Sequence, residues 1–325
     1  MKICFVDNTK FNYDSSYKHT NNLRGAESVL INLSNSLKDL GNDITVINNC
    51  PNSKVINDIS WININKSFEL KDYDLVISNG DCNNFKYANG KKNILLSHSN
   101  QPIEQFLRKK QLFSYLKYKP KICFSSKFHQ KKRSKLISLF GDIFLPWSVD
   151  EMFINTKISP TVNNSQAIFT SRPERNQNLL IDIWSKSIFK RNNNLKLLIY
   201  GNTNYENKNG IKNINFVNQN DLINDLKNSR VFLIPGHRAE TFCLAAEEAK
   251  ELCVPLVTLG IGCLPERVDH GKTGYIAKNI NEFVNYTIKL FNNDDTWSNF
   301  RNNLIKNRGK YNWSMVAKKL IENFK

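Results

Sequence analysis

The sequence predicts an α/β protein with two similar units, and three observations lead to this prediction. Short apolar runs of strand length alternate with longer stretches of helical periodicity, as in parallel sheets connected by helices. This pattern pauses after Pro146, in a polar stretch, and then starts again. The chain has 325 residues, a length typical of two domains. We therefore expect two α/β units that face each other across a cleft, with ligands at the carboxyl ends of the strands.

The first unit is expected at residues 1–150. It opens with an apolar run at residues 2–7, which is typical of a buried strand. A long polar stretch follows this run. Residues 25–41 then carry aliphatic side chains at helical spacing, and Gly41 is a suitable helix end. The further strand-like runs lie at residues 43–48, 73–79, 92–98, 121–126 and 142–147.

The second unit is expected at residues 166–305, after a polar linker at residues 151–165 that contains Pro160. From about residue 281 onward the pattern is helical only, and residues 306–325 are expected to form a separate helical segment. The strand-like runs of this unit lie at residues 166–171, 195–201, 214–218, 231–236, 254–260 and 273–277.

The composition excludes several classes of protein. Hydrophobic residues make up 40% of the chain, too many for a disordered tail, and no apolar run is long enough to span a membrane. The first residues are too polar for a signal peptide. Seven scattered cysteines without a CxxC pair favour reduced thiols, so we expect a cytoplasmic protein. The net charge of +17 favours anionic partners.

The most informative stretch is residues 230–277, where a strand-like run is followed by a loop and a helix. Glu240 lies before the expected helix and Glu248 within it. The first backbone NH groups of a helix lack partners, and the helix dipole there favours phosphate. Two carboxylates beside an anion site suit a sugar linked to a nucleotide, because they can accept hydrogen bonds from its hydroxyls. We expect the backbone at the helix start to bind this nucleotide-linked sugar. The residues concerned are Thr241, Phe242, Cys243 and Leu244.

Residues 240–248 (ETFCLAAEE) and 254–277 (VPLVTLGIGCLPERVDHGKTGYIA) closely resemble family 4 (group 1) retaining glycosyltransferases, which have the GT-B fold. Glu240 and Glu248 match the two glutamates of that family's Glu-x7-Glu signature. Cys243 stands where the family most often has glycine, which narrows the room beside the donor phosphate. The resemblance implies two Rossmann-like domains facing each other across a central cleft. It places the acceptor on the N-terminal domain and the nucleotide-sugar on the C-terminal domain, with the final helical segment crossing back.

The resemblance continues through the rest of the chain. The sequence LRGAESVLINLSNSL looks like the family's glycine-rich loop and first helix, with Arg24 in place of the first glycine. Gly25 remains, and the resemblance implies that its backbone approaches the donor diphosphate. His98 matches a histidine near the reacting sugar. Arg172 matches an arginine that binds the diphosphate, and Arg175 stands where the family usually has lysine.

The resemblance implies a transferase that moves a sugar from a UDP- or GDP-sugar to a hydroxyl acceptor. The acceptor would be a glycan or lipid-linked glycan in the synthesis of cell-surface polysaccharide or lipopolysaccharide. Glu240 would hold hydroxyls of the transferred sugar, with His98 as the second catalytic residue, and Glu248 would hold the ribose. Neither a metal ion nor another cofactor is expected, because two arginines, Gly25 and the helix start can neutralise the leaving diphosphate instead. Retention would proceed by attack on the face from which the diphosphate leaves.

Two other functions stay open at this point. A sugar-nucleotide epimerase could share the two-domain fold and the donor pocket. A non-catalytic protein that binds nucleic acid would account for the positive charge alone.

Residues 106–140 carry eleven lysines and arginines, interleaved with apolar side chains, and no acidic residue. This composition suits peripheral contact with the anionic inner face of a membrane. It would also suit single-stranded nucleic acid, although no RNA-binding motif occurs and no nucleic acid is expected as a partner. A solvated basic face with an ordinary buried side is the third interpretation.

Overall fold

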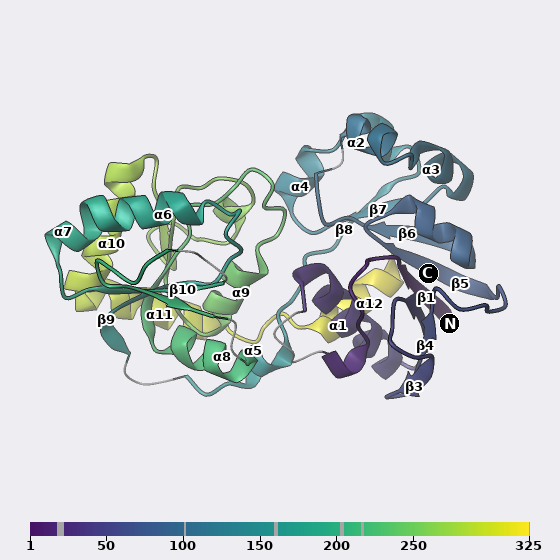
Figure 1. Ribbon diagram of the computed structural model, residues 1–325, viewed down its shortest axis with the longest axis horizontal. Coiled ribbons are helices and arrows are strands. Elements are labelled where there is room, and N and C mark those ends of the chain that lie inside the picture. Colours follow the sequence, from purple (N-terminus) through teal and green to yellow (C-terminus); the bar gives the residue numbers. More distant parts are fainter. Residues whose placement is uncertain (18–22, 101, 159–161, 202–204, 216–217, 325) are drawn as a thin grey trace. The chain divides into compact units, whose positions relative to one another are not determined.

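The computed structural model describes residues 1–17, 23–100, 102–158, 162–201, 205–215 and 218–324. The chain divides into two compact units. Unit 1 consists of Met1–Trp147 together with Asn312–Lys325, and unit 2 consists of Ser148–Tyr311. Each unit is α/β and has its own predominantly parallel sheet (Figure 1), which confirms the predicted fold class.

Unit 1 contains an eight-stranded sheet in the order β3-β4-β2-β1-β5-β6-β7-β8. Neighbouring strands pair in parallel, except that β3 and β4 form an antiparallel hairpin. Strand β1 is buried on both faces after its first residue, which explains its continuous apolar run. The strands are β1 (Lys2–Asp7), β2 (Asp43–Asn48), β3 (Lys54–Ile56), β4 (Ile59–Asn63), β5 (Asp72–Asn79), β6 (Asn89–Leu96), β7 (Lys121–Phe124) and β8 (Asp142–Phe144).

The longest helix of the first part of unit 1 packs against a helix from the far end of the chain. Helix α1 (Gly25–Asp39) contacts α12 (Trp313–Glu322), and the Trp313 ring stacks on Trp147 with 6.4 Å between centroids. In Figure 1 the yellow α12 lies among the purple and blue elements of unit 1. The other α-helices of unit 1 are α2 (Ile103–Arg108), α3 (Leu112–Tyr118) and α4 (Lys127–Lys131), and its short 3-10 helices are η1 (Ser15–Tyr17), η2 (Cys82–Tyr87) and η3 (Lys135–Ser138).

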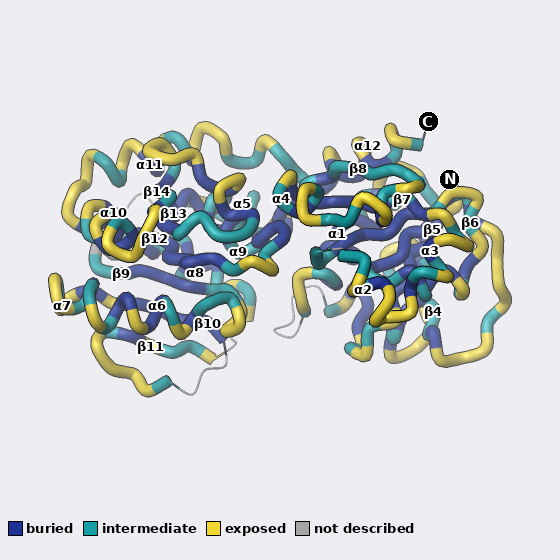
Figure 2. The backbone as a smooth tube through the Cα atoms, turned by 90° about the horizontal axis from the view of Figure 1, so that it is seen from above, coloured by how far each residue is buried: buried dark blue, intermediate teal, exposed yellow. Residues whose placement is uncertain are grey.

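Unit 2 contains a six-stranded parallel sheet in the order β11-β10-β9-β12-β13-β14. The dark-blue strands at its centre are buried, and the exposed yellow segments lie mainly on helices and loops (Figure 2). Its strands are β9 (Asn163–Phe169), β10 (Lys196–Tyr200), β11 (Ile211–Ile214), β12 (Ser229–Leu233), β13 (Leu256–Thr258) and β14 (Gly274–Ile276).

Eight short or medium helical segments surround this sheet within the described part of unit 2. They are the α-helices α5 (Glu151–Asn155), α6 (Gln177–Ile183), α7 (Phe189–Arg191), α8 (Gln219–Lys227), α9 (Leu244–Glu251), α10 (Ile280–Asn292) and α11 (Asp294–Asn307), and the π-helical turn η4 (Trp184–Ile188); the 3-10 turn η5 (Leu264–Glu266) lies between β13 and β14. None of the helices in the described ranges is long and apolar enough to cross a bilayer.

The segment predicted as a linker, residues 151–165, contains regular structure. Helix α5 forms there because the Asp150 side chain caps it, accepting a hydrogen bond from the Met152 NH at 2.9 Å. Strand β9 already begins at Asn163. Pro160 lies outside the described residues.

Two other segments differ in detail from the sequence-based expectation. A strand was expected at residues 214–218, but the strand in this region, β11, lies earlier and ends at Ile214. Residues 216–217 lie outside the described ranges. Within residues 306–325, α11 ends at Asn307 and α12 begins at Trp313, so unit 2 extends to Tyr311. All seven cysteines are buried and have free thiols.

Candidate active site

Two loops of unit 2 approach each other closely beyond the ends of β12 and β13. Gly236, which follows β12, forms an isolated parallel bridge with Ile261. A Cβ atom at Gly236 would lie 2.8 Å from the Ile261 carbonyl oxygen, and one at Gly262 would lie 2.5 Å from the His237 carbonyl oxygen. Both glycines also have positive φ, 95° and 76°. Only glycine permits this approach, which fixes the loop that carries Glu240.

Arg175 contacts two side chains of that loop. Its Nε lies 3.1 Å from Glu240 Oε2, and both side chains are largely buried, with 16% and 12% exposed. Its Nη1 lies 3.2 Å from His237 Nδ1, which also accepts a hydrogen bond from the Ala239 NH at 3.1 Å. Because Nδ1 accepts, the neutral His237 ring carries its hydrogen on Nε2. The contact places a positive and a negative group side by side beyond the sheet.

Arg172 belongs to the same cluster, which we call the arginine–glutamate cluster and define as Arg172, Arg175 and Glu240. Burial raises the pKa of Glu240, while the charges of Arg175 and Arg172 act in the opposite direction. Arg172 itself is exposed. Asn176 has a φ of 64° and donates from Nδ2 to the Gly236 carbonyl oxygen at 2.6 Å. This bond ties the arginine-bearing loop after β9 to the loop after β12.

Helix α9 starts beside this cluster, and its N-cap is Cys243. Cys243 has a φ of 64°, in the left-handed region, and makes no side-chain capping bond. A left-handed backbone favours glycine, which gives a physical reason for glycine at this position in the resembling family. The Cys243 side chain is buried, and burial raises the pKa of its thiol. The first NH groups of α9 lack carbonyl partners within the helix, as at every helix start.

Glu248 lies on α9 and differs from its neighbour Glu247. Glu247 pairs with Arg267 at 2.7 Å and Lys250 at 2.9 Å, so its pKa lies below the usual range although burial opposes ionisation. Burial, together with the negative charge of Asp150, raises the pKa of Glu248 to about 7. Glu247 therefore forms ion pairs within unit 2. A hydrogen-bond donor placed beside Glu248 would stabilise its ionised form.

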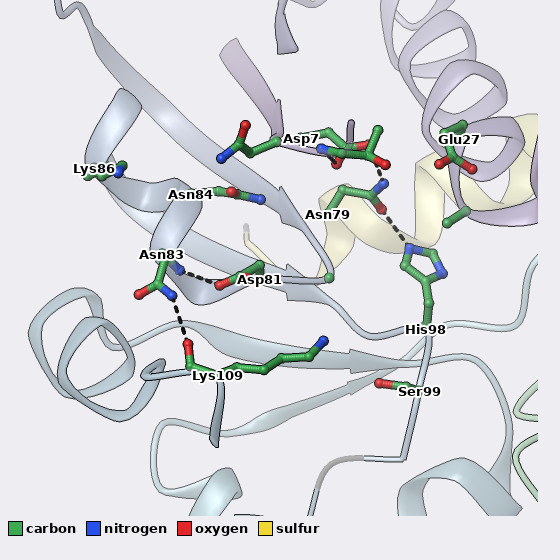
Figure 3. Close-up of a pocket in the computed structure, with 14 residues that line it drawn as sticks. Asp7, Glu27, Asn79, Asp81, Asn83, Asn84, Lys86, His98, Ser99 and Lys109 are labelled. Atoms are coloured by element: carbon green, nitrogen blue, oxygen red, sulfur yellow. Dashed lines mark hydrogen bonds between the residues drawn. The ribbon is translucent and has the colours of Figure 1, made fainter. Parts of the chain in front are cut away.

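Unit 1 contains a polar cavity of about 440 Å³. Its wall includes three carboxylates, Asp7, Glu27 and Asp81, and the predicted site residue His98 (Figure 3). Gly25, also predicted as a site residue, is the exposed first residue of α1, two positions before Glu27. The other residues of the wall are Asn8, Thr9, Ala26, Asn79, Gly80, Asn83, Asn84, Lys86, Ser99 and Lys109.

His98 belongs to a chain of hydrogen-bonded side chains at one wall of this cavity (Figure 3). His98 Nε2 lies 2.6 Å from Asn79 Oδ1, and Asn79 Nδ2 donates to Asp7 Oδ2 at 2.9 Å. The Tyr13 hydroxyl also donates to Asp7 Oδ2, at 2.6 Å. Burial, with the charge of His129 as a second cause, lowers the pKa of His98 to about 4. The imidazole is therefore neutral at physiological pH.

The structure thus brings together part of the predicted site within unit 2. Arg172, Arg175 and Glu240 form one cluster, and the start of α9 follows Glu240 directly in the chain. Gly25 and His98 belong to unit 1, and their part in the same active site stays a prediction. Sequence reasoning did not select His237, Asp7 or Asn79. These three residues could have been found from their positions in the sequence, because each ends or follows a buried strand, where ligands of parallel sheets bind.

Among the side chains in the described ranges, no group of three or more His, Cys, Asp or Glu residues is arranged to hold an ion.

Comparisons with known proteins support the assignment of the fold. Residues 163–310 match the family model of the group 1 glycosyl transferases. The fold is similar to HepE from Anabaena, crystallised with UDP and glucose, at a TM-score of 0.73 and 15% identity over 100% of this chain and 99% of that one. It is also similar to a glycosyltransferase from Rickettsia africae, at a TM-score of 0.69 and 15% identity over 99% and 97% of the two chains.

A third similar structure is sucrose-phosphate synthase from Thermosynechococcus elongatus, with a TM-score of 0.67 and 12% identity over 99% of this chain and 98% of that one. No curated protein sequence matches the chain at a significant level. The chain therefore has the GT-B fold, and most of its second unit is similar to the group 1 glycosyl transferases.

Proposed function

We propose that the protein is a retaining glycosyltransferase of family 4 that moves a hexose from a UDP- or GDP-sugar to a hydroxyl acceptor. The observation that carries this proposal is the arginine–glutamate cluster, beyond the ends of β9 and β12 and next to the start of α9. Two guanidinium groups suit a pyrophosphate, and a carboxylate beside them suits sugar hydroxyls. The presence of UDP and glucose in the HepE crystal, a protein of the same fold, supports this choice of donor.

In this proposal each group has a separate role. Arg172 and Arg175 hold the diphosphate and stabilise its growing charge as it leaves, together with the start of α9. Glu240 accepts hydrogen bonds from hydroxyls of the transferred sugar, and Glu248 accepts them from the ribose. Because fixed cationic side chains can neutralise the leaving group, the proposed mechanism requires no metal ion.

Retention of configuration requires attack from the face on which the diphosphate leaves. The acceptor oxygen forms its bond to the anomeric carbon while the bond from that carbon to the phosphate oxygen breaks. The departing phosphate oxygen takes the proton of the acceptor hydroxyl, so no separate protein base is needed. Glu240 then acts by holding the sugar in place and not as the nucleophile.

We propose that the cavity of unit 1 receives the acceptor. Its wall is made of carboxylates, amides and hydroxyls, which are the groups that bind a polyhydroxyl molecule. A glycan or lipid-linked glycan in the synthesis of cell-surface polysaccharide or lipopolysaccharide is the proposed class of acceptor. Lys86 and Lys109 add positive charge to the same wall, which suits an acceptor that also carries an anionic group.

The test of the donor proposal is a thermal-shift screen with UDP-, GDP- and ADP-sugars, followed by product analysis. A ligand that binds only the folded state raises the melting temperature in proportion to its affinity. Arg175→Ala should abolish the shift, whereas Arg191→Ala, an exposed arginine on α7 of the same unit, should leave it unchanged. If no sugar nucleotide shifts the wild-type protein, the proposal fails.

Product analysis also separates the proposal from the epimerase alternative. A transferase releases the nucleoside diphosphate and joins the sugar to the acceptor or, slowly, to water. An epimerase returns an altered sugar nucleotide without acceptor. Release of free nucleoside diphosphate with an unaltered sugar supports the transferase.

We propose further that unit 1 docks on an anionic membrane surface through helices α2 and α3. Phe113 is 77% exposed, and Leu107 and Leu116 are 55% and 47% exposed. Lys110 is exposed in the turn between α2 and α3, and Lys117 is exposed on α3. Exposed apolar side chains next to lysines are the composition of a surface that inserts shallowly among anionic headgroups.

Liposome flotation tests the docking surface. Phe113→Ser combined with Leu116→Ser should reduce binding to vesicles that contain phosphatidylglycerol, and Lys110→Glu with Lys117→Glu should do the same. Ile305→Ser, an exposed apolar residue of α11 in unit 2, is the matched control. Lys109 is left intact, because it also lines the cavity. Unchanged flotation of the double variants would reject the membrane proposal, and salt-sensitive RNA binding lost in the same variants would favour nucleic acid instead.

A further inference from the structure

The Arg175 side chain has two polar contacts within the described part of unit 2, and only one of them is a hydrogen bond. Its Nε lies 3.1 Å from Glu240 Oε2, but this ion pair lacks the geometry of a hydrogen bond. Its Nη1 lies 3.2 Å from His237 Nδ1 and is hydrogen-bonded to it. An ion pair depends mainly on distance, whereas a hydrogen bond requires the N–H group to point at its acceptor. His237 therefore sets the orientation of the guanidinium group.

The direction of the hydrogen bonds at His237 follows from the chemistry of their donors. Guanidinium groups and backbone NH groups only donate, and both Arg175 Nη1 and the Ala239 NH are directed at His237 Nδ1. Nδ1 must therefore carry a lone pair, which the two donors share. A doubly protonated ring would direct an N–H group at both donors, so the contact with Arg175 requires a neutral His237 with its hydrogen on Nε2.

The His237 ring is itself fixed by the turn to which it belongs. The His237 carbonyl oxygen accepts from the Glu240 NH at 2.9 Å, and its ring accepts from the Ala239 NH at 3.1 Å. The neighbouring loop packs directly against this turn, because a Cβ atom at Gly262 would lie 2.5 Å from the same carbonyl oxygen. The imidazole is therefore a fixed acceptor to which the longer and more flexible side chain of Arg175 is attached.

One nitrogen of the Arg175 side chain is left for a ligand. Within the described ranges Nη2 has neither a hydrogen bond nor an ion pair. Nη2 is also not buried, so it is open to solvent although only 16% of the Arg175 side chain is exposed. Nη2 carries two hydrogens and can donate both of them to the oxygens of one phosphate group.

We propose that His237 is a positioning residue that acts through Arg175, holding Nη1 so that Nη2 is presented to the diphosphate of the sugar nucleotide. The guanidinium group then needs no reorientation while negative charge grows on the leaving phosphate, which is the condition for effective electrostatic stabilisation. Without this bond, ordering the long side chain on binding would cost affinity. This consequence for the reaction rests on the proposed glycosyltransferase function, whereas the hold on the guanidinium group does not.

Nitrogen-15 NMR of the full-length protein without ligand tests the hold itself. A guanidinium group that is hydrogen-bonded through one Nη rotates slowly about its Cζ–Nε bond and gives separate signals for its two Nη atoms. We expect separate signals for Arg175 in the wild-type protein, assigned with Arg175→Ala, and one averaged signal in His237→Leu. Averaged signals in the wild-type protein, or separate signals in His237→Leu, would overturn the proposal. A protonated Nδ1 on His237 would also overturn it, even if no variant folds.

Two substitutions separate the acceptor atom from the ring. His237→Leu removes the acceptor, whereas His237→Asn keeps an acceptor oxygen, which in asparagine readily bonds the NH two residues further on. UDP and GDP are the probes, and uridine and guanosine are the matched probes without phosphate. His237→Leu should weaken binding of the diphosphate by about fivefold or more and leave binding of the nucleoside unchanged, and His237→Asn should restore most of the loss. Equal losses for nucleoside and diphosphate would indicate a disordered loop and reject the positioning role.

A double-mutant cycle shows whether His237 acts through Arg175. In the Arg175→Ala protein, the further change His237→Leu should have no additional effect on diphosphate binding, because the group that His237 positions is already absent. NMR titration at high nucleotide concentration measures the weak binding of these variants. Losses that simply add would show that His237 acts independently of Arg175, and would reject the proposal.

The two proposals fail separately. Separate Arg175 signals in a protein that binds neither UDP nor GDP would reject the glycosyltransferase, and with it the part of His237 in the reaction, but not its hold on Arg175. Sugar transfer at the wild-type rate in His237→Leu would reject the positioning role and leave the glycosyltransferase in place. In the expected result, His237→Leu lowers kcat for sugar transfer by about tenfold.

Discussion

Arg175 Nε lies 3.1 Å from Glu240 Oε2, and neither side chain is more than one-sixth exposed. The pair is not satisfied internally, because Glu240 Oε2 has no hydrogen bond within the described part of the chain despite its ionic contact with Arg175. A buried carboxylate oxygen without a donor is costly, so a ligand hydroxyl that donates to it gains that free energy. We therefore expect the site to prefer an anion that also carries hydroxyl groups over a simple anion.

Glu240→Gln should lower turnover more than it weakens binding of the sugar nucleotide. The variant keeps the size of the side chain but replaces a charged acceptor by a neutral amide. We expect kcat to fall by about a hundredfold, as for other preorganised polar groups in active sites. Steady-state kinetics and calorimetric binding on the same preparation measure both quantities. A variant with the wild-type rate would remove the proposed role of Glu240.

Donor binding should strengthen as the pH rises through about 7. Glu248 has a pKa of about 7 in the free protein, and only its ionised form accepts hydrogen bonds from both ribose hydroxyls. Between about pH 6 and about pH 8 the affinity should rise by up to about tenfold. Calorimetry with UDP-glucose and GDP-mannose measures this, because their diphosphates do not titrate in that range. Glu248→Gln should bind more weakly at high pH and lose the dependence.

Cys243 should tolerate glycine but not valine. At a φ of 64° a side chain costs about 1–2 kcal/mol, which Cys243→Gly recovers. The gain is offset by the loss of a buried thiol and by the entropy of glycine, so the net change in unfolding free energy should stay within about 1 kcal/mol. Cys243→Val should destabilise the protein by about 2 kcal/mol, because a β-branched residue fits this backbone poorly. Urea unfolding of both variants distinguishes these outcomes.

Acid should destabilise the protein between about pH 6.5 and about pH 4. Burial lowers the pKa of both His98 and His129 to about 4 in the folded chain. In the unfolded chain the same rings bind protons at their ordinary pKa of 6.5, so the stability present above that pH is lost as the pH falls toward 4. Melting temperatures across this range should fall less steeply in His129→Asn.

The alternation of strands and helices predicted most of the fold, but one hairpin was missed. Strands β3 and β4 are joined by Asn57 and Asp58, whose φ angles of 49° and 59° are both positive. A loop of two left-handed residues is typical of tight hairpins, and asparagine and aspartate tolerate this backbone well. The signal was present as an Asn-Asp pair between short apolar runs, but strands of three and five residues give too little periodicity.

The site was predictable where it depends on position along the chain. Arg175 and Glu240 each follow a strand of the same sheet, and ligands of parallel sheets gather at the strand ends. The chain from Asp7 to His98 was not predictable, because it depends on β5 lying between β1 and β6. Strand order is a tertiary property, and nothing in a single strand's composition specifies its neighbours.

The two units differ in how early during synthesis each can be finished. All residues of unit 2 are contiguous, so it can complete its sheet as soon as Tyr311 has been made. Unit 1 needs α12, which is translated only after the whole of unit 2, to cover α1 and to stack Trp313 on Trp147. A fragment that ends at Trp147 would expose the apolar face of α1 to solvent and to other chains. Any attempt to prepare unit 1 alone should therefore graft residues 312–324 onto it through a short loop.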